Sequence, residues 1–306
     1  MRPRGFCAGV VRAIQTVEKA LKIWGSPIYV KHEIVHNKHV VNSLKEKGAI
    51  FIEDLNEVPI GEKVIYSAHG VSPQIRDMAK KRNLFEIDAT CGLVTKIHSA
   101  VKRFSKKGYK IILIGKKKHV EIIGIASEAP EDTIVIEKKE DIDNLSFNQN
   151  QKLFYITQTT LSIDDVKEIV SALIKKFPKI ETLPSSSICY ATTNRQMALK
   201  KEANNVDLVL VVGDPTSSNS NRLKELAIKK KQVAYLINSE NEIKDSWFEN
   251  VKKIAMTAGA STPETVVQKC IEKLLDFGLK KVHEIVYKDE DVVFALPTQL
   301  DGVLTK

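Results

Sequence analysis

The sequence predicts an α/β protein made of three similar lobes, each built on a small and mostly parallel sheet. Short apolar runs rich in Val, Ile, Tyr and Phe alternate with amphipathic stretches along almost all of the 306 residues, which is the pattern of repeated βα units. A set of about three or four such units with one distinctive cysteine recurs at roughly 80 to 100 residues, the size of a small domain. We therefore expect three lobes that meet around a common centre.

The strands are predicted from apolar runs bounded by polar or turn residues. Such runs recur from the first quarter of the chain to its last sixth and are separated by segments long enough for a helix. They cover residues 28–30, 49–52, 64–67, 85–88, 110–114, 133–136, 153–156, 208–212, 233–237 and 253–256.

Two helices carry clear start signals. Ser162 and Asp165 form a Ser-x-x-Asp capping box, which predicts a helix from about residue 163. Thr262 followed by Pro263 predicts another start, with Thr as the N-cap and Pro at the first helical position. In that second helix Cys270 falls in register with apolar neighbours, so we interpret it as a buried core thiol.

The composition limits the classes of function. The net charge of +9 could suggest nucleic acid, but the Lys residues are spread along the chain and are rarely interleaved with aromatic residues, so no nucleic-acid partner is expected. No stretch approaches the roughly 20 apolar residues of a membrane helix, and the start has no apolar signal region. We expect a cytoplasmic protein that does not bind a membrane.

Polar segments follow the predicted strands repeatedly. In open parallel sheets, ligands bind beyond the carboxyl ends of the strands, so this is where function is expected. A single histidine or Ser/Thr cluster there is more often a structural partner or a helix cap. The repetition favours a binding site. The segments are residues 33–37, 67–70, 88–91, 115–121, 157–160, 212–221 and 257–261.

Three of the four cysteines lie in the same kind of position. Cys7 lies among small residues before a predicted helix, Cys91 ends a strand, and Cys189 precedes a Tyr-Ala-Thr-Thr-Asn run. Thiolates suit zinc or iron-sulfur clusters, and helix N-termini favour the thiolate form. Spacing alone does not establish a metal site, because there is no Cys-x-x-Cys pair. Three ligands on a four-iron cluster would leave one iron open to substrate.

Read together, these segments resemble the 4-hydroxy-3-methylbut-2-enyl diphosphate reductase family, which catalyses the terminal step of the non-mevalonate isoprenoid pathway. The similarity runs from Pro3 to about Pro297. It rests on Pro3-Arg4-Gly5-Phe6-Cys7-Ala8-Gly9-Val10, Val35-His36-Asn37, Ser67-Ala68-His69-Gly70, Asp88-Ala89-Thr90-Cys91, His119-x-Glu121, Thr157-Gln158-Thr159-Thr160-Leu161, Ile188-Cys189-Tyr190-Ala191-Thr192-Thr193-Asn194-Arg195-Gln196, Ser217-Ser218-Asn219-Ser220-Asn221-Arg222-Leu223 and Thr257-Ala258-Gly259-Ala260-Ser261.

The resemblance implies a pseudo-threefold arrangement of the lobes around one central 4Fe-4S cluster per chain, with Cys7, Cys91 and Cys189 as its ligands. It implies that the open iron binds the hydroxyl oxygen of the substrate, Glu121 delivers protons, and Thr159 lies beside the hydroxymethyl end of the substrate. The implied contacts of the diphosphate are His36, His69, His119, Ser217, Ser218, Asn219 and Ser261.

The implied reaction is a reductive dehydroxylation that yields isopentenyl and dimethylallyl diphosphate. Two electrons arrive one at a time, and water leaves after protonation through Glu121 and Thr159. The chain has no flavin motif, so the resemblance assigns electron delivery to reduced ferredoxin or flavodoxin. We expect a monomer or a weak homodimer.

The predicted lobes are residues 1–92, with Cys7 and Cys91, residues 93–186, with His119, Glu121 and Thr159, and residues 187–306, with Cys189, 217–219, Ser261 and a C-terminal tail.

Two other interpretations stay open at this point. The chain could be a zinc-holding or purely structural α/β protein descended from such an enzyme. It could also be a nucleotide- or RNA-binding module that uses the same strand ends, in which case binding would be sensitive to salt and the cysteines would be dispensable.

Overall fold

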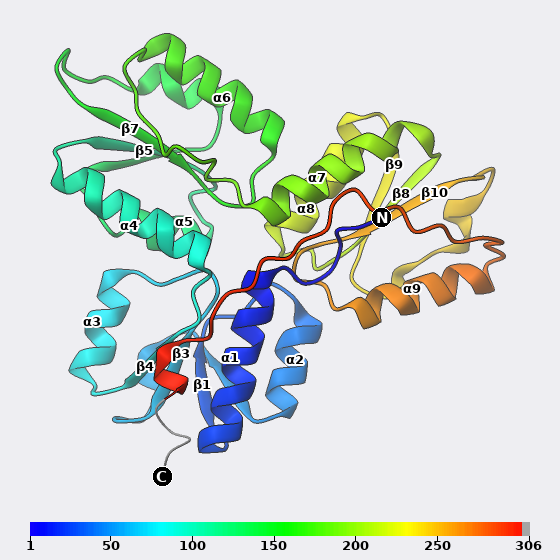
Figure 1. Cartoon of the computed structure of the whole chain (residues 1–306), viewed down its shortest axis with the longest axis horizontal. Helices are drawn as coiled ribbons and strands as arrows, with labels where there is room; N and C mark the ends of the chain where they lie inside the picture. The colour runs from blue at the N-terminus through cyan, green and yellow to red at the C-terminus, as the bar shows by residue number, and fades with distance from the viewer. Residues whose placement is uncertain (302–306) are drawn as a thin grey trace. The chain divides into compact units, whose positions relative to one another are not determined.

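The computed structural model describes residues 1–301, and within them the strands form three sheets (Figure 1). Every strand pair is parallel. The first sheet, in the order β2-β1-β3-β4, contains β1 (Ile28–Lys31), β2 (Ala49–Ile52), β3 (Lys63–Tyr66) and β4 (Phe85–Asp88).

The other two sheets have three strands each and repeat the order of the first three strands of the first sheet. The second, in the order β6-β5-β7, contains β5 (Lys110–Ile114), β6 (Thr133–Ile136) and β7 (Leu153–Thr157). The third, in the order β10-β8-β9, contains β8 (Leu208–Val212), β9 (Val233–Ile237) and β10 (Ile254–Ala258). The predicted strands and the α/β class with three small parallel sheets are confirmed, with strand ends shifted by one or two residues in a few cases.

In each sheet the first strand lies between the second and third strands. The chain therefore places the second strand on one side of the first strand and the third strand on the other side. The first and third strands are neighbours, and the loops that follow them diverge. These pairs are β1 and β3, β5 and β7, and β8 and β10. Such a topological switch point is where open parallel sheets bind ligands.

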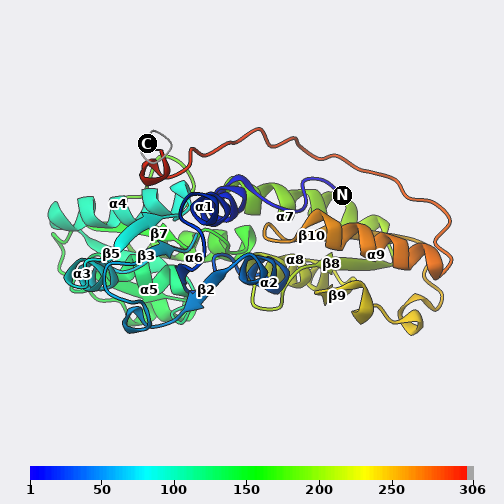
Figure 2. The ribbon, with the colours of Figure 1, turned by 90° about the horizontal axis from the view of Figure 1, so that it is seen from below.

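Helices cover both faces of the third sheet (Figures 1 and 2). Because successive strand residues point to opposite faces, Leu208, Leu210 and Val212 pack with α9, whereas Val209 and Val211 pack with α7 and α8. The second sheet is covered in the same way by α4 and α5 on one face and by α6 on the other. The helices are α1 (Ala8–Trp24), α2 (Lys38–Glu46), α3 (Pro73–Lys81), α4 (Gly92–Lys106), α5 (Val120–Ala126), α6 (Ile163–Lys176), α7 (Tyr190–Glu202), α8 (Ser218–Lys229) and α9 (Glu264–Asp276). Within residues 1–301, none has both the length and the apolar content needed to cross a membrane.

The chain divides into two compact units. The smaller unit contains residues 1–11, 36–42 and 190–293, including the third sheet, and the larger unit contains residues 12–35, 43–189 and 294 onward, including the first and second sheets. Each unit is thus assembled from separate stretches of the sequence. The predicted lobe boundaries at residues 92 and 186 stay a prediction.

One predicted helix cap is confirmed and the other is wrong. The Ser162 hydroxyl accepts a hydrogen bond from the Asp165 amide at the start of α6. Helix α9 instead begins after Pro263, and the Thr262 hydroxyl donates to the Val212 carbonyl at 3.0 Å, because the end of β8 offers a nearby buried acceptor. Cys270 is fully buried on α9, as its register predicts.

Gly70 and Gly108 provide a matched test of the packing between the turn after β3 and His98 of α4, since both glycines have a φ of +79°. A Cβ on Gly70 would lie 2.9 Å from Nε2 of His98, whereas one on Gly108 would meet no heavy atom of residues 1–301 within 4 Å. Gly108→Ala should destabilise the fold by about 1–2 kcal/mol through the strain of a positive φ alone. Gly70→Ala should cost roughly 1–3 kcal/mol more because of crowding. Urea unfolding of both variants measures the difference, and equal losses would contradict this packing.

Candidate active site

The polar segments predicted from the sequence follow strands at the switch points. Residues after β1 and β3, after β5 and β7, and after β8 and β10 supply almost all of them, and the segment that ends at Cys91 follows β4. Strands β2, β6 and β9, which lie at sheet edges, carry none of the predicted segments. The topology therefore gathers these segments at the carboxyl ends of the strands in each sheet.

In the larger unit, Cys91 is tied to the turn that carries His69. The Cys91 amide donates to the Ala68 carbonyl at 3.0 Å, and the Cys91 carbonyl accepts from the Thr95 amide at 2.9 Å in the first turn of α4. The cysteine thus stands at the N-cap of α4, half-buried, with its backbone held from both sides.

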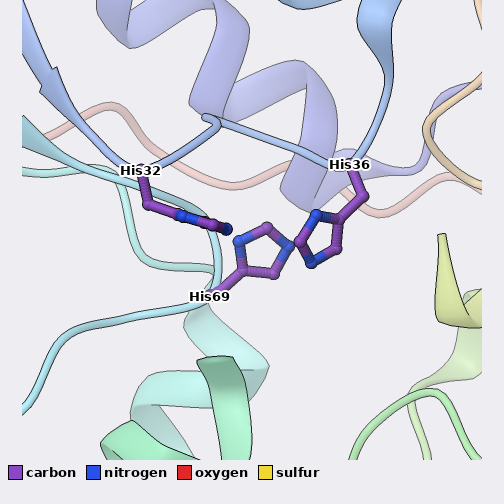
Figure 3. Close-up of side chains that lie close together, drawn as sticks. All are labelled: His32, His36 and His69. Carbon is purple, nitrogen blue, oxygen red and sulfur yellow. The ribbon is translucent and has the colours of Figure 1, made fainter. Parts of the chain in front are cut away.

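Histidine rings gather at the ends of β1, β3 and β5. The Nδ1 atom of His69 lies 3.2 Å from the Ser67 hydroxyl. Its ring centroid lies 6.0 Å from that of His119 and 6.0 Å from that of His32, edge to face in both cases. Figure 3 shows the rings of His32 and His69 side by side. His119, the N-cap of α5, accepts at Nδ1 from the Glu121 amide at 3.2 Å. His69 and His119 are therefore close together, as an anion-binding site requires.

Glu121 is a fully buried carboxyl group in the first turn of α5. Its Oε1 accepts from the Thr159 amide at 2.7 Å, and its Oε2 accepts from the Thr159 hydroxyl at 2.8 Å. Burial raises the pKa of Glu121 to about 7, even though both hydrogen bonds from Thr159 lower it. At neutral pH this carboxyl can therefore both hold and release a proton.

The same threonine connects Glu121 to a second cysteine. The Cys189 amide donates to the Thr159 carbonyl at 3.0 Å, just before α7 begins at Tyr190. Within the larger unit, the predicted residues Cys189, Thr159, Glu121 and His119 are thus linked by successive hydrogen bonds, and the His119 ring contacts that of His69.

In the smaller unit, one hydrogen-bonded network connects the predicted residues around the end of β10. The Cys7 amide donates to the Ala260 carbonyl at 3.0 Å, and the Ala260 amide donates to Oδ1 of Asn219 at 3.1 Å. The Ser261 hydroxyl donates to the His36 carbonyl at 3.0 Å. Cys7, His36, Asn219 and Ser261 are therefore brought together in this unit.

The N-terminus of α8 lies in the same network. Ser217 is the N-cap and accepts from the Ser220 amide, and Ser218 and Asn219 form the buried first turn. The loop before it is held by Asp214, whose carboxylate accepts from the Thr216 and Lys38 amides. Although burial raises the pKa of Asp214, these hydrogen bonds lower it below its ordinary value. The first turn of α8 thus presents hydroxyl and amide groups where a helix dipole favours an anion.

The environment of the cysteines separates three of them from the fourth. Cys7, Cys91 and Cys189 are half-buried, and each directly precedes a helix, α1, α4 or α7. Cys270 is buried inside α9, and burial raises its pKa to about 12, with smaller contributions from Glu240 and Glu242. Helix N-termini favour negative charge, so the first three positions suit thiolate ligands and the fourth suits a neutral thiol.

Comparisons with known proteins identify the family of the chain. The model of the family described as LytB protein matches residues 1–275. The chain belongs to the LytB protein family. The 4-hydroxy-3-methylbut-2-enyl diphosphate reductase of Protochlamydia amoebophila (strain UWE25) is 66% identical over 97% of this chain and 95% of its own length, and that of Chlamydia pneumoniae is 62% identical over 97% and 96%.

A solved structure supports the family at the level of the fold. The structure of the E-1-hydroxy-2-methyl-but-2-enyl-4-diphosphate reductase from Plasmodium falciparum is similar with a TM-score of 0.92 and 51% identity. It covers 98% of this chain and 95% of its own chain. LytB membership thus agrees with the resemblance that the sequence motifs carry.

Sequence reasoning assigned no role to several residues that shape the site. His32 contacts the His69 ring, Asp214 holds the loop before α8, and Thr192 accepts from the Asn219 side chain at 3.2 Å. The sequence of α7 contains a signal that could have found Thr192, because this helix lacks an apolar stripe. In the structure its buried residues include the polar side chains Thr192, Asn194, Arg195 and Gln196. A buried helix of this kind indicates that its polar side chains hold other parts of a site.

The raised pKa of Glu121 predicts how stability depends on pH. Between the ordinary glutamate pKa of 4.5 and about 7, the unfolded chain loses this proton and the folded chain keeps it, so Glu121 makes folding less favourable as pH rises. Glu121→Gln should therefore gain stability relative to wild type across this window, by roughly 3 kcal/mol, and the difference should level off above pH 7. Urea unfolding of the metal-free protein at several pH values measures it.

Glu128 provides the control for this experiment. Burial raises its pKa, but hydrogen bonds from His98 and Lys102 lower it further, so that the net shift is downward. Glu128→Gln should therefore lose stability relative to wild type as pH rises toward the ordinary glutamate pKa of 4.5, and the difference should stay constant between 4.5 and 7, where that of Glu121→Gln grows. A stability difference for Glu121→Gln that does not change with pH would contradict the assigned protonation of Glu121.

Proposed function

We propose that this chain reduces 4-hydroxy-3-methylbut-2-enyl diphosphate to isopentenyl diphosphate and dimethylallyl diphosphate, the terminal step of the non-mevalonate isoprenoid pathway. The names of its relatives supply the substrate class. The observation that carries the proposal is the buried Glu121 carboxyl, with a pKa of about 7, hydrogen-bonded twice to Thr159. Loss of an allylic hydroxyl as water needs such a proton source.

The proposed cofactor is one 4Fe-4S cluster held by Cys7, Cys91 and Cys189. The donor set fits, since these are the half-buried cysteines that precede helices, whereas Cys270 is enclosed in apolar surroundings. Thiolates are the usual ligands of iron-sulfur clusters. When bound, such a cluster supplies electrons and a Lewis-acidic iron.

The proposed diphosphate site combines imidazoles, hydroxyls and a helix N-terminus. The first turn of α8 offers backbone amides and a favourable dipole. Imidazole N–H groups and serine hydroxyls complete the set of donors that a diphosphate needs. The proposed contacts are His36, His69, His119, Ser217, Ser218, Asn219 and Ser261.

The geometry around Glu121 defines a route for the proton. The Thr159 amide can only donate, so Oε1 stays an acceptor and the acidic proton belongs on Oε2. With that proton in place, Oε2 donates to the Thr159 hydroxyl, whose own hydrogen is then directed toward another acceptor. We assign that acceptor as the departing hydroxyl of the substrate, so Thr159 orients Glu121 and relays its proton.

The electrons are proposed to come from reduced ferredoxin or flavodoxin. A basic chain with a net charge of +9 can attract such acidic proteins at low ionic strength. The expectation of a monomer or a weak homodimer stays a prediction.

Glu121→Gln tests the proposed reaction step directly. Glutamine keeps the shape and both contacts with Thr159 but has no acidic proton, so kcat should fall roughly 10²- to 10⁴-fold while KM changes little. Turnover is measured under strict anaerobic conditions with an artificial electron donor, and iron content should match wild type. Thr159→Ser, which keeps the hydroxyl, should retain most of the activity, and Thr159→Val should lose it. Near-normal turnover by Glu121→Gln would exclude the assigned role.

A further inference from the structure

Helix α7 contains a buried arginine to which the proposed reaction assigns no role. Arg195 is 1% exposed, which is unusual for a charged side chain, and it lies among the buried polar residues of α7. A buried guanidinium is tolerated only when it is paired and hydrogen-bonded. Its partners therefore indicate what it holds in place.

Arg195 connects the C-terminal tail to the loop that carries Cys7. Its Nη1 atom lies 3.1 Å from Oε2 of Glu290, in the tail that follows α9, and also donates to the Ala191 carbonyl of its own helix. Its Nη2 atom donates to the Gly5 carbonyl at 2.8 Å. Glu290 is itself mostly buried, and its Oε1 accepts from the Asn194 side chain at 2.9 Å. The two terminal nitrogens of the guanidinium are thus bonded to the tail on one side and to the cysteine loop on the other.

The bond to Gly5 fixes the backbone just before a proposed ligand. Gly5 has a φ of +74° and lies two residues before Cys7. The Cys7 amide is held separately by the Ala260 carbonyl at 3.0 Å. Two anchors therefore bracket Phe6, so the backbone position of Cys7 is determined by Arg195 together with the end of β10.

In the larger unit, Arg12 makes the same kind of connection to the loop of Cys91. It donates to the Thr90 and Asp88 carbonyls, at 2.9 and 3.1 Å, directly before that cysteine. Its Nε atom donates to the Ala295 carbonyl of the tail at 2.6 Å. Beside it, the ring of Phe294 lies against Gly92, the residue after Cys91, since a Cβ there would be 3.4 Å from the ring. A second arginine thus joins a cysteine loop to the tail.

The geometry of these contacts suits arginine. Each side chain donates to two different segments from nitrogens that lie apart in a rigid planar fork, whereas an ammonium has all of its donors on one atom. The tail residues that receive these bonds lie beyond residues 1–275, the part matched by the family model. The tail is therefore a candidate part of the site that the family model alone does not cover.

We propose that the C-terminal tail, through Arg195 and Arg12, positions the Cys7 and Cys91 loops for cluster binding, with Glu290 as the positioning residue for Cys7. The inference rests on the proposed function, because it takes these cysteines to be cluster ligands. Both arginines act through backbone carbonyls one to three positions before the cysteines.

Glu290→Gln and Arg195→Lys test the proposal in anaerobically purified full-length protein. Gln removes the charge that pairs with Arg195 while keeping the size of the side chain, and Lys keeps the charge but loses the fork. The rate of iron release to a chelator should rise roughly tenfold or more in both, the range typical of residues that support metal ligands. The electron paramagnetic resonance spectrum of the reduced cluster should also change. Circular dichroism and thermal unfolding check that the variants are folded.

Arg82→Lys is the matched control, because Arg82 also donates to a loop carbonyl, that of Val58 at 2.6 Å, far in sequence from any cysteine. It should leave iron release and the spectrum as in wild type. Wild-type rates and spectra in Glu290→Gln and Arg195→Lys would overturn the inference and leave the proposed function intact. A wild-type protein without iron or sulfide would overturn the proposed function itself.

Discussion

The placement of the first strand between the second and third strands of each sheet is the constraint on which the candidate site depends. Because all strands are parallel, each connection must cross over the sheet. The loops after the first and third strands therefore diverge at the carboxyl ends of these strands. Backbone amides and helix N-termini at these strand ends are left available for a ligand. The same arrangement occurs three times in one chain, so three similar sheets can each supply polar segments.

Much of the fold was predictable because the physical signal is local. A buried parallel strand needs a continuous apolar run, and β8, for example, is Leu-Val-Leu-Val-Val with every residue buried. The polar segments after the strands were visible for the same reason. The resemblance alone implied that Glu121 and Thr159 both take part in protonation, and their direct contact required the structure, since 38 positions separate the two residues.

The parts that sequence reasoning missed depend on partners distant in the sequence. Arg195 donates to a carbonyl 190 positions away, and no periodicity reports such a bond. Thr262 looked like a helix cap because Pro follows it, but the carbonyl at the end of β8 was the better-placed acceptor. The two compact units likewise combine separate stretches, which the spacing of the cysteines could not reveal.

Electrostatics favours different proposed roles for the four cysteines and the buried acid. The N-terminus of a helix favours negative charge, whereas burial keeps the Cys270 thiol neutral, and the same desolvation keeps a proton on Glu121 near neutral pH. The proposed ligands and the proposed proton donor are thus distinguished by their surroundings rather than by residue type.

The proposal that the three cysteines hold a cluster used in the reduction is tested most directly by two measurements on anaerobically purified protein. These are the content of iron and acid-labile sulfide and the turnover of 4-hydroxy-3-methylbut-2-enyl diphosphate. Wild type and Cys270→Ala should each contain about four irons and four sulfides per chain and form both products, whereas Cys91→Ser should lose iron and activity. A colourless protein that contains zinc and lacks iron and sulfide, or a Cys91→Ser variant with full activity, would contradict it.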